Sequence, residues 1–71
     1  MQRFPEKLVT LRERRGMSQR KLADALGFHH TYINRLEKGE RKPNAAFLLK
    51  VSQLFRISAD VLLNDDLELT G

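Results

Sequence analysis

The side chains best suited to chemistry lie in one short stretch, GFHHTYINRLEKG, residues 27–39. Two glycines bracket about three helical turns, in which only Ile33 and Leu36 are clearly apolar. On the opposite side of such a helix, one arc of roughly 140° holds His30, Thr31, Asn34, Arg35 and Lys38. A helix face that is merely solvated would more commonly carry Glu and Lys pairs. These short or planar hydrogen-bonding groups instead suit the base edges in a DNA major groove.

Other kinds of chemistry are poorly supported. His29 and His30 are adjacent and would point about 100° apart on a helix, whereas a chelating pair needs a spacing of three or four residues. The chain has no cysteine and no other histidine, so we expect no metal site. Ser18, Ser52 and Ser58 show no nucleophile motif, and no carboxylate pair or phosphate-cradling glycine loop occurs. We therefore expect neither an enzyme nor a cofactor or small-molecule ligand.

The charge is distributed unevenly along the 71 residues. Residues 1–43 contain eleven Lys and Arg against five Asp and Glu, whereas residues 44–71 contain two against four. A basic half favours nucleic acid or an anionic surface as partner, although solubility alone would also explain it. No apolar run approaches the ~20 residues of a membrane span, and no signal-peptide core occurs. We expect a cytoplasmic protein without membrane contact.

The elements that must position these side chains are all helical. Ser18, Asn44 and Ser58 are good N-caps, and Gly27 and Gly39 suit helix ends. No run of alternating β-branched residues competes, so the fold class is all-α, a compact five-helix bundle. A chain of this length forms one domain at most, residues 1–71. The expected helices are 5–15, 18–26, 29–38, 44–55 and 58–63, followed by an acidic tail, 64–71, that we expect to fray.

Residues 8–55 resemble the Cro/repressor-type (XRE-type) helix-turn-helix family of bacterial and phage regulators. The elements LRERRGMSQRKLADALG, TYINRLEKGERKP and FLLKVSQLF occur in the order and spacing of that family. The resemblance implies a lambda-repressor-like domain that binds double-stranded DNA, usually as a dimer on a palindromic operator. In its size, the chain resembles a Cro-like switch protein or the controller protein of a restriction–modification system. It would regulate transcription, including that of its own promoter, in a bacterial or phage-infected cytoplasm.

The resemblance also implies roles for individual residues. Arg35 is the candidate for a guanine, through a bidentate contact to O6 and N7. Gln19 matches a glutamine that grips a phosphate and often braces a base-reading side chain. His29 stands where a small capping residue is more usual, so either the cap is lost or the ring meets a phosphate. The base-reading candidates are His30, Thr31, Asn34 and Arg35, and the DNA-backbone candidates are Ser18, Gln19, Arg20, His29, Tyr32, Lys38, Arg41 and Lys42.

Glu37 has a structural interpretation. On a helical wheel it lies about 40° from Ile33, on the buried side. The resemblance implies a partly buried ion pair between Arg12 and Glu37. The alternative is an exposed Glu37, whose pairing would contribute little.

The C-terminal half contains more apolar residues than one small core needs. One recognition helix reads too few base pairs for specificity in a genome, so we expect a homodimer. The predicted interface residues are Leu49, Ile57, Val61 and Leu63; alternatively, a tighter bundle buries them within one chain. A competing function is an antitoxin-type protein–protein interaction module in which DNA binding is secondary.

Overall fold

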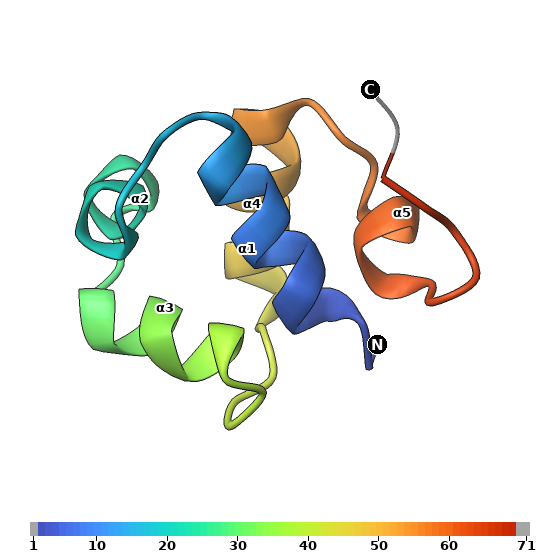
Figure 1. Ribbon diagram of the computed structural model, residues 1–71, viewed down its shortest axis with the longest axis horizontal. Coiled ribbons are helices and arrows are strands. Elements are labelled where there is room, and N and C mark those ends of the chain that lie inside the picture. The colour runs from blue at the N-terminus through green and yellow to red at the C-terminus, as the bar shows by residue number, and fades with distance from the viewer. Residues whose placement is uncertain (1, 70–71) are drawn as a thin grey trace.

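The computed structural model describes residues 2–69, which form five α-helices and no strand (Figure 1). The all-α prediction is thus confirmed, and each helix begins and ends within one residue of its predicted bounds. In Figure 1, α1 and α4 lie at the centre of the view, α2 and α3 to the left and α5 to the right. The helices are α1 Phe4–Arg14, α2 Gln19–Leu26, α3 His30–Glu37, α4 Ala45–Phe55 and α5 Ala59–Leu63. Within the described residues, no helix has both the length and the apolar character needed to cross a bilayer.

Three of the helices, α2, α4 and α5, begin where the sequence places capping side chains. Ser18 Oγ accepts a hydrogen bond from the backbone N–H of Lys21 at 3.0 Å, and Asn44 Oδ1 accepts one from Phe47 at 2.8 Å. Ser58 caps α5 in the same way. Each cap provides a partner for an N–H group that the helix itself leaves unpaired.

Apolar side chains from all five helices form one core. Phe47 is fully buried and lies edge-on to the rings of Phe4, Phe28 and Tyr32, with ring centroids 5.1–6.5 Å apart. The buried apolar residues are Phe4, Leu8, Leu11, Leu22, Ala23, Leu26, Ile33, Leu36, Phe47, Val51 and Leu62. Only two of them belong to α3, so that helix is attached to the body by a narrow apolar stripe.

The prediction that the acidic tail frays is wrong for residues 64–69. The Asp65 carboxylate accepts hydrogen bonds from the backbone N–H groups of Gln2 and Arg3, both at 2.9 Å. The Arg3 guanidinium donates to both carboxylate oxygens of Glu68, at 2.6 and 2.8 Å, and Leu69 packs against the core. The tail is ordered because the start of α1 offers it N–H groups and a cation, which favour carboxylates. Residues 70 and 71 lie outside the described part of the chain.

These contacts predict how acid affects stability. Hydrogen bonds from the Arg3 and Gln2 N–H groups lower the pKa of Asp65 from 3.8 to about 2, and the Arg3 guanidinium lowers the pKa of Glu68. The unfolded chain therefore binds more protons in acid than the folded chain does. The stabilisation is complete above the usual aspartate value of 3.8 and is lost as the pH falls through about 2. We expect the melting temperature to fall more steeply over this range in the wild type than in Asp65→Asn, measured by circular dichroism. Parallel losses in the two proteins would contradict the assignment.

Candidate nucleic-acid interface

The turn between α2 and α3 is held by backbone and aromatic contacts. Gly27 adopts a left-handed conformation, with φ of 76°, and the Phe28 N–H donates to the carbonyl of Ala23 at 2.9 Å. The ring of Phe28 stacks on that of Tyr32, with centroids 5.4 Å apart. Glycine suits this position because other residues rarely adopt a positive φ. The turn thus sets the direction in which α3 leaves α2, as in a helix-turn-helix.

The polar arc of α3 faces outward, as its spacing predicts. Thr31, Arg35 and Lys38 are exposed, whereas His30 and Asn34 are half-buried. Ile33 and Leu36 on the other side are fully buried. The structure therefore presents all four base-reading candidates together on one side of a single helix.

His29 caps α3 through its imidazole ring. Its Nδ1 atom accepts a hydrogen bond from the backbone N–H of Thr31 at 3.2 Å, so of the two alternatives raised by the sequence, loss of the cap is wrong. Because Nδ1 accepts, the proton of the neutral ring belongs on Nε2. The ring also stacks on that of His30, with centroids 4.6 Å apart. Both imidazoles are thereby oriented at the start of α3.

A chain of polar contacts runs from α1 to the outward side of α3. The Asn34 amide donates to Gln19 Oε1 at 3.2 Å, and the Gln19 amide donates to Glu37 Oε1 at 2.9 Å. Glu37 in turn accepts from the guanidinium of Arg12, at 2.7 and 3.0 Å. Gln19 therefore braces Asn34 in this structure. Its contact with a phosphate stays a prediction.

Arg12 and Glu37 form the ion pair that the resemblance implied. Their side chains are only 14% and 6% exposed, and Arg12 Nη1 also donates to the carbonyl of Met17 at 2.8 Å. The hydrogen bond with Glu37 raises the pKa of Arg12 above its usual range. The third acceptor, the Met17 carbonyl, could not be anticipated from helical spacing, because it lies in the turn before α2.

Tyr32 has a contact that the sequence did not indicate. Its hydroxyl accepts a hydrogen bond from the backbone N–H of Asn44 at 3.3 Å, and its ring is half-buried. Tyr32 therefore links α3 to the start of α4. This structural contact exists beside its predicted role at the DNA backbone.

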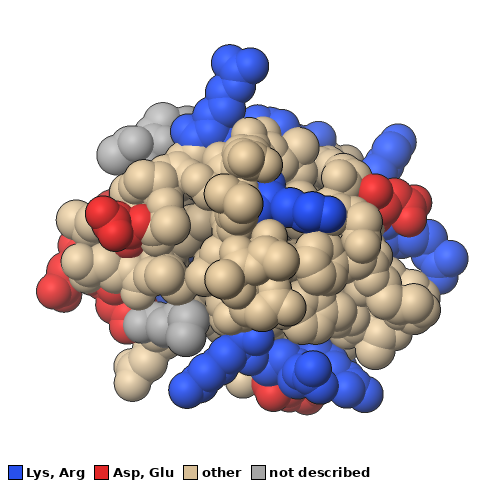
Figure 2. Space-filling view, turned by 180° about the vertical axis from the view of Figure 1, so that it is seen from behind, with Lys and Arg blue, Asp and Glu red and all other residues tan. Residues whose placement is uncertain are grey.

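The remaining DNA-backbone candidates flank α3. Ser18 and Arg20 are exposed at the start of α2, and Arg41 and Lys42 are exposed in the loop before α4. Seen from behind, Lys and Arg gather along the lower edge of the molecule, the end where α3 and that loop lie in Figure 1 (Figure 2). Cations placed on both sides of a helix can pair with phosphates and so position it without specifying a sequence.

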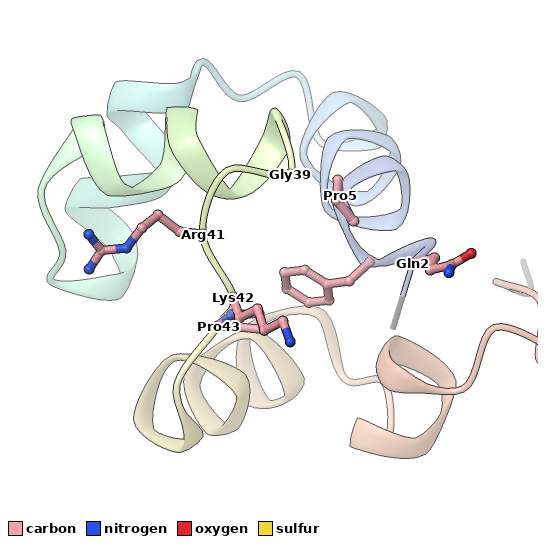
Figure 3. Close-up of a pocket in the computed structure, with 7 residues that line it drawn as sticks. Gln2, Pro5, Gly39, Arg41, Lys42 and Pro43 are labelled. Atoms are coloured by element: carbon pink, nitrogen blue, oxygen red, sulfur yellow. The ribbon is translucent and has the colours of Figure 1, made fainter.

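A cleft of about 350 Å³ separates that loop from the start of α1. Pro5, Gly39 and Pro43 border it, and Arg41 and Lys42 extend to opposite sides of the loop (Figure 3). The loop cations therefore cover a wider stretch of surface than one shared direction would allow.

The four predicted interface residues have different environments. Leu49 is 60% exposed, whereas Val61 and Leu63 are half-buried. Ile57 packs against the core, as the single-chain alternative expected for it. Leu67 is 40% exposed and was not predicted for this surface.

Comparison with known proteins identifies the family. A helix-turn-helix family model matches residues 8–62. An uncharacterized HTH-type transcriptional regulator of Mycobacterium tuberculosis, MT0491, is 39% identical over 51 residues, which is 72% of this chain and 36% of that protein. The chain spans between 31% and 56% of the length of the curated relatives it matches.

Two solved structures share the fold of this chain, and their sequence identities to it differ little. The P22 c2 repressor in complex with a synthetic operator superposes with a TM-score of 0.81 at 28% identity, over 86% of this chain and 92% of that one. The restriction–modification controller protein C.AhdI from Aeromonas hydrophila superposes with a TM-score of 0.77 at 29% identity, over 87% and 94%. The match across most of the chain, together with the capped turn and the outward polar arc of α3, shows that this protein belongs to the helix-turn-helix family.

Proposed function

We propose that this chain is a sequence-specific DNA-binding transcriptional regulator that inserts α3 into the major groove of double-stranded DNA. The observation that carries the proposal is the outward arc of α3, on which His30, Thr31, Asn34 and Arg35 lie together above a narrow apolar stripe. The likeness to the P22 c2 repressor, solved with a synthetic operator, supports it.

Within this proposal the side chains divide into two groups. Arg35 pairs with guanine, Thr31 offers its methyl group to thymine, and Asn34 pairs with adenine; the base preferred by His30 stays open. The second group contacts phosphates and sets the register: Ser18, Gln19, Arg20, His29, Tyr32, Lys38, Arg41 and Lys42.

Selection of bound duplexes from a random pool tests sequence specificity. We expect enrichment of a palindromic sequence, and we expect its affinity to fall steeply between about 50 and 200 mM salt because phosphate contacts release counterions. Binding without enrichment would contradict sequence specificity. No binding at all would favour the antitoxin-type interaction module instead.

We further propose that the chain acts as a homodimer through α4 and α5. Leu49 is the most exposed large apolar side chain of the described residues. The middle of the face seen in Figure 2 consists mainly of residues that are neither basic nor acidic, with acidic side chains to its left. A two-fold contact there would cover apolar surface and place two α3 helices about 34 Å apart, one turn of DNA.

Oligomeric state tests the dimer directly. In sedimentation equilibrium at micromolar concentration, we expect the wild type to be dimeric. Leu49→Glu should raise the dimer dissociation constant at least about tenfold, because a carboxylate would be buried without a partner. Ala25→Glu, an equivalent change on the exposed side of α2, serves as the matched control and should remain dimeric. A wild type that stays monomeric on a palindromic duplex would overturn the dimer.

The regulated gene is the last part of the proposal. We infer that the chain acts on its own promoter, as a controller protein or a Cro-like repressor, and its likeness to C.AhdI supports the first of these. The selected palindrome should then occur upstream of its own gene, where footprinting would reveal protection. Absence of protection there, with specific binding elsewhere, would contradict autoregulation.

A further inference from the structure

Among the described residues, Lys7 on α1 is the one charged residue that is buried, with 2% of its surface exposed. Its Nζ atom donates to the backbone carbonyls of Val61, Asn64 and Leu67, at 2.6, 2.9 and 2.7 Å. These three acceptors use all three protons of the ammonium group. The cation thus lies at the C-terminal end of α5, where the carbonyls and the helix dipole favour positive charge.

The same end of α1 makes further contacts with the segment after α5. Arg3 Nη1 donates to the carbonyl of Asp65 at 3.0 Å in addition to its bidentate pairing with Glu68. Together with Lys7, it attaches residues 61–68 to the first turns of α1. This attachment explains why the tail is ordered although only Leu69 of residues 64–69 packs against the core.

α1 contacts both the recognition helix and the helix proposed for the dimer surface, since it packs against α3 and α5. Arg12 of α1 pairs with Glu37 of α3, and Lys7 of α1 binds the end of α5. Five residues apart, Lys7 and Arg12 are about 7.5 Å apart along the helix axis and about 140° apart around it. α1 therefore carries one buried cation, Lys7, and one largely buried cation, Arg12, that face two different partners.

Burial of an ammonium without a carboxylate partner is an expensive way to stabilise a core, and an apolar side chain of similar size often does so better. The contribution of the ammonium is that it fixes the position of the segment it binds. Three short hydrogen bonds, one to α5 and two to the segment that follows it, constrain the end of α5 in more directions than an apolar contact, which permits sliding. The buried lysine therefore defines the placement of α5 rather than the amount of core.

We propose that Lys7 is a positioning residue for operator recognition: by holding α5 on α1, it sets the separation of the two α3 helices in the dimer. The inference rests on the proposed dimer through α4 and α5. One of the acceptors, the Val61 carbonyl, belongs to a predicted interface residue. Movement of α5 on α1 would therefore move the partner and its α3.

The test compares the wild type with Lys7→Met, which keeps an unbranched side chain one atom shorter and removes the ammonium. The control is Lys21→Met, because Lys21 is exposed on α2, outside the two helices proposed for the dimer. Amide hydrogen exchange reports the attachment. Duplexes carrying the selected half-sites at the best spacing, at spacings one base pair longer and shorter, and as a single half-site report recognition.

In Lys7→Met we expect exchange of residues 61–69 to accelerate at least about tenfold while α2 and α3 keep their protection. The wild type should prefer the best spacing about tenfold, and the variant should prefer it less than about threefold, with single half-site affinity unchanged. Lys21→Met should resemble the wild type in the exchange of residues 61–69 and in its spacing preference. If Lys7→Met does not fold, Arg3→Gln should show the same pattern to a smaller degree.

Three results would overturn the inference. Unchanged exchange in residues 61–69 would show that Lys7 does not hold α5, and faster exchange with an intact spacing preference would show that it holds α5 without positioning the dimer. A wild type that has no spacing preference overturns the dimer itself, and with it this role of Lys7. The exchange data distinguish failure of the dimer from failure of the Lys7 contacts, because they report the attachment of residues 61–69 to α1 whether or not a dimer forms.

Discussion

Glu37→Gln is expected to lower the free energy of unfolding by about 2 kcal/mol and the melting temperature by about 10 °C. Glu37 accepts two hydrogen bonds from Arg12 and one from Gln19, and its side chain is only 6% exposed. The substitution leaves the guanidinium of Arg12 in a largely buried place without its counter-charge. A glutamine retains part of the hydrogen bonding, so the loss should lie below the 3–5 kcal/mol or so of a fully broken buried pair.

Thermal and urea unfolding measure this effect. Glu40→Gln is the matched control, because it removes the same charge from an exposed residue three positions further along the chain. We expect it to change stability by less than about 0.5 kcal/mol. An unchanged melt for Glu37→Gln combined with lost DNA affinity would show that Glu37 contributes to DNA reading instead of to folding.

Arg35→Ala is expected to weaken binding to the selected operator by about 1–3 kcal/mol for each half-site and to relax the preference at one base pair of it. Arg35 is exposed on the outward arc of α3, so its removal should leave the core and the melting temperature unchanged. The substitution would remove both donors of the proposed bidentate contact to guanine.

Affinity measurements on the selected operator and on single-base variants of it separate reading from positioning. Lys38→Ala, one turn from Arg35 by its spacing and also exposed, is the control. It should weaken all sequences equally and lower the slope of log affinity against log salt by about one. Equal weakening on all sequences in Arg35→Ala would assign that residue to a phosphate.

Local sequence signals were sufficient for the helices and for the outward arc of α3. Ser18, Asn44 and Ser58 cap the helices that they were expected to cap, because a cap acts on N–H groups two or three residues away. The arc of α3 follows from 100° of rotation per residue, so the exposed and buried sides of that helix could be derived without knowledge of its neighbours.

Some features of the site depended on contacts between elements. The sequence left open whether His29 retains a cap, and the structure decides it through the orientation of the imidazole toward Thr31. Leu49 lies within α4 and Ile57 just after it, and both are apolar. Ile57 nevertheless packs on the core, whereas Leu49 stays exposed. Leu49 lies on a side of α4 that the other helices leave exposed, whereas the segment after α4 turns Ile57 onto the core.

Lys7 shows most clearly what local sequence signals do not predict. It occupies a buried position of α1 between Phe4 and Leu8, so a lysine within an apolar stripe was a visible signal, but its partners were not. The carbonyls that accept its hydrogen bonds lie 54–60 residues further along the chain, one in α5 and two in the tail that was expected to fray. Helix caps and helical periodicity act over a few residues and are written in the local sequence. The attachment of α5 and residues 64–69 to α1 required the folded chain, because only tertiary packing brings the end of α5 to the start of α1.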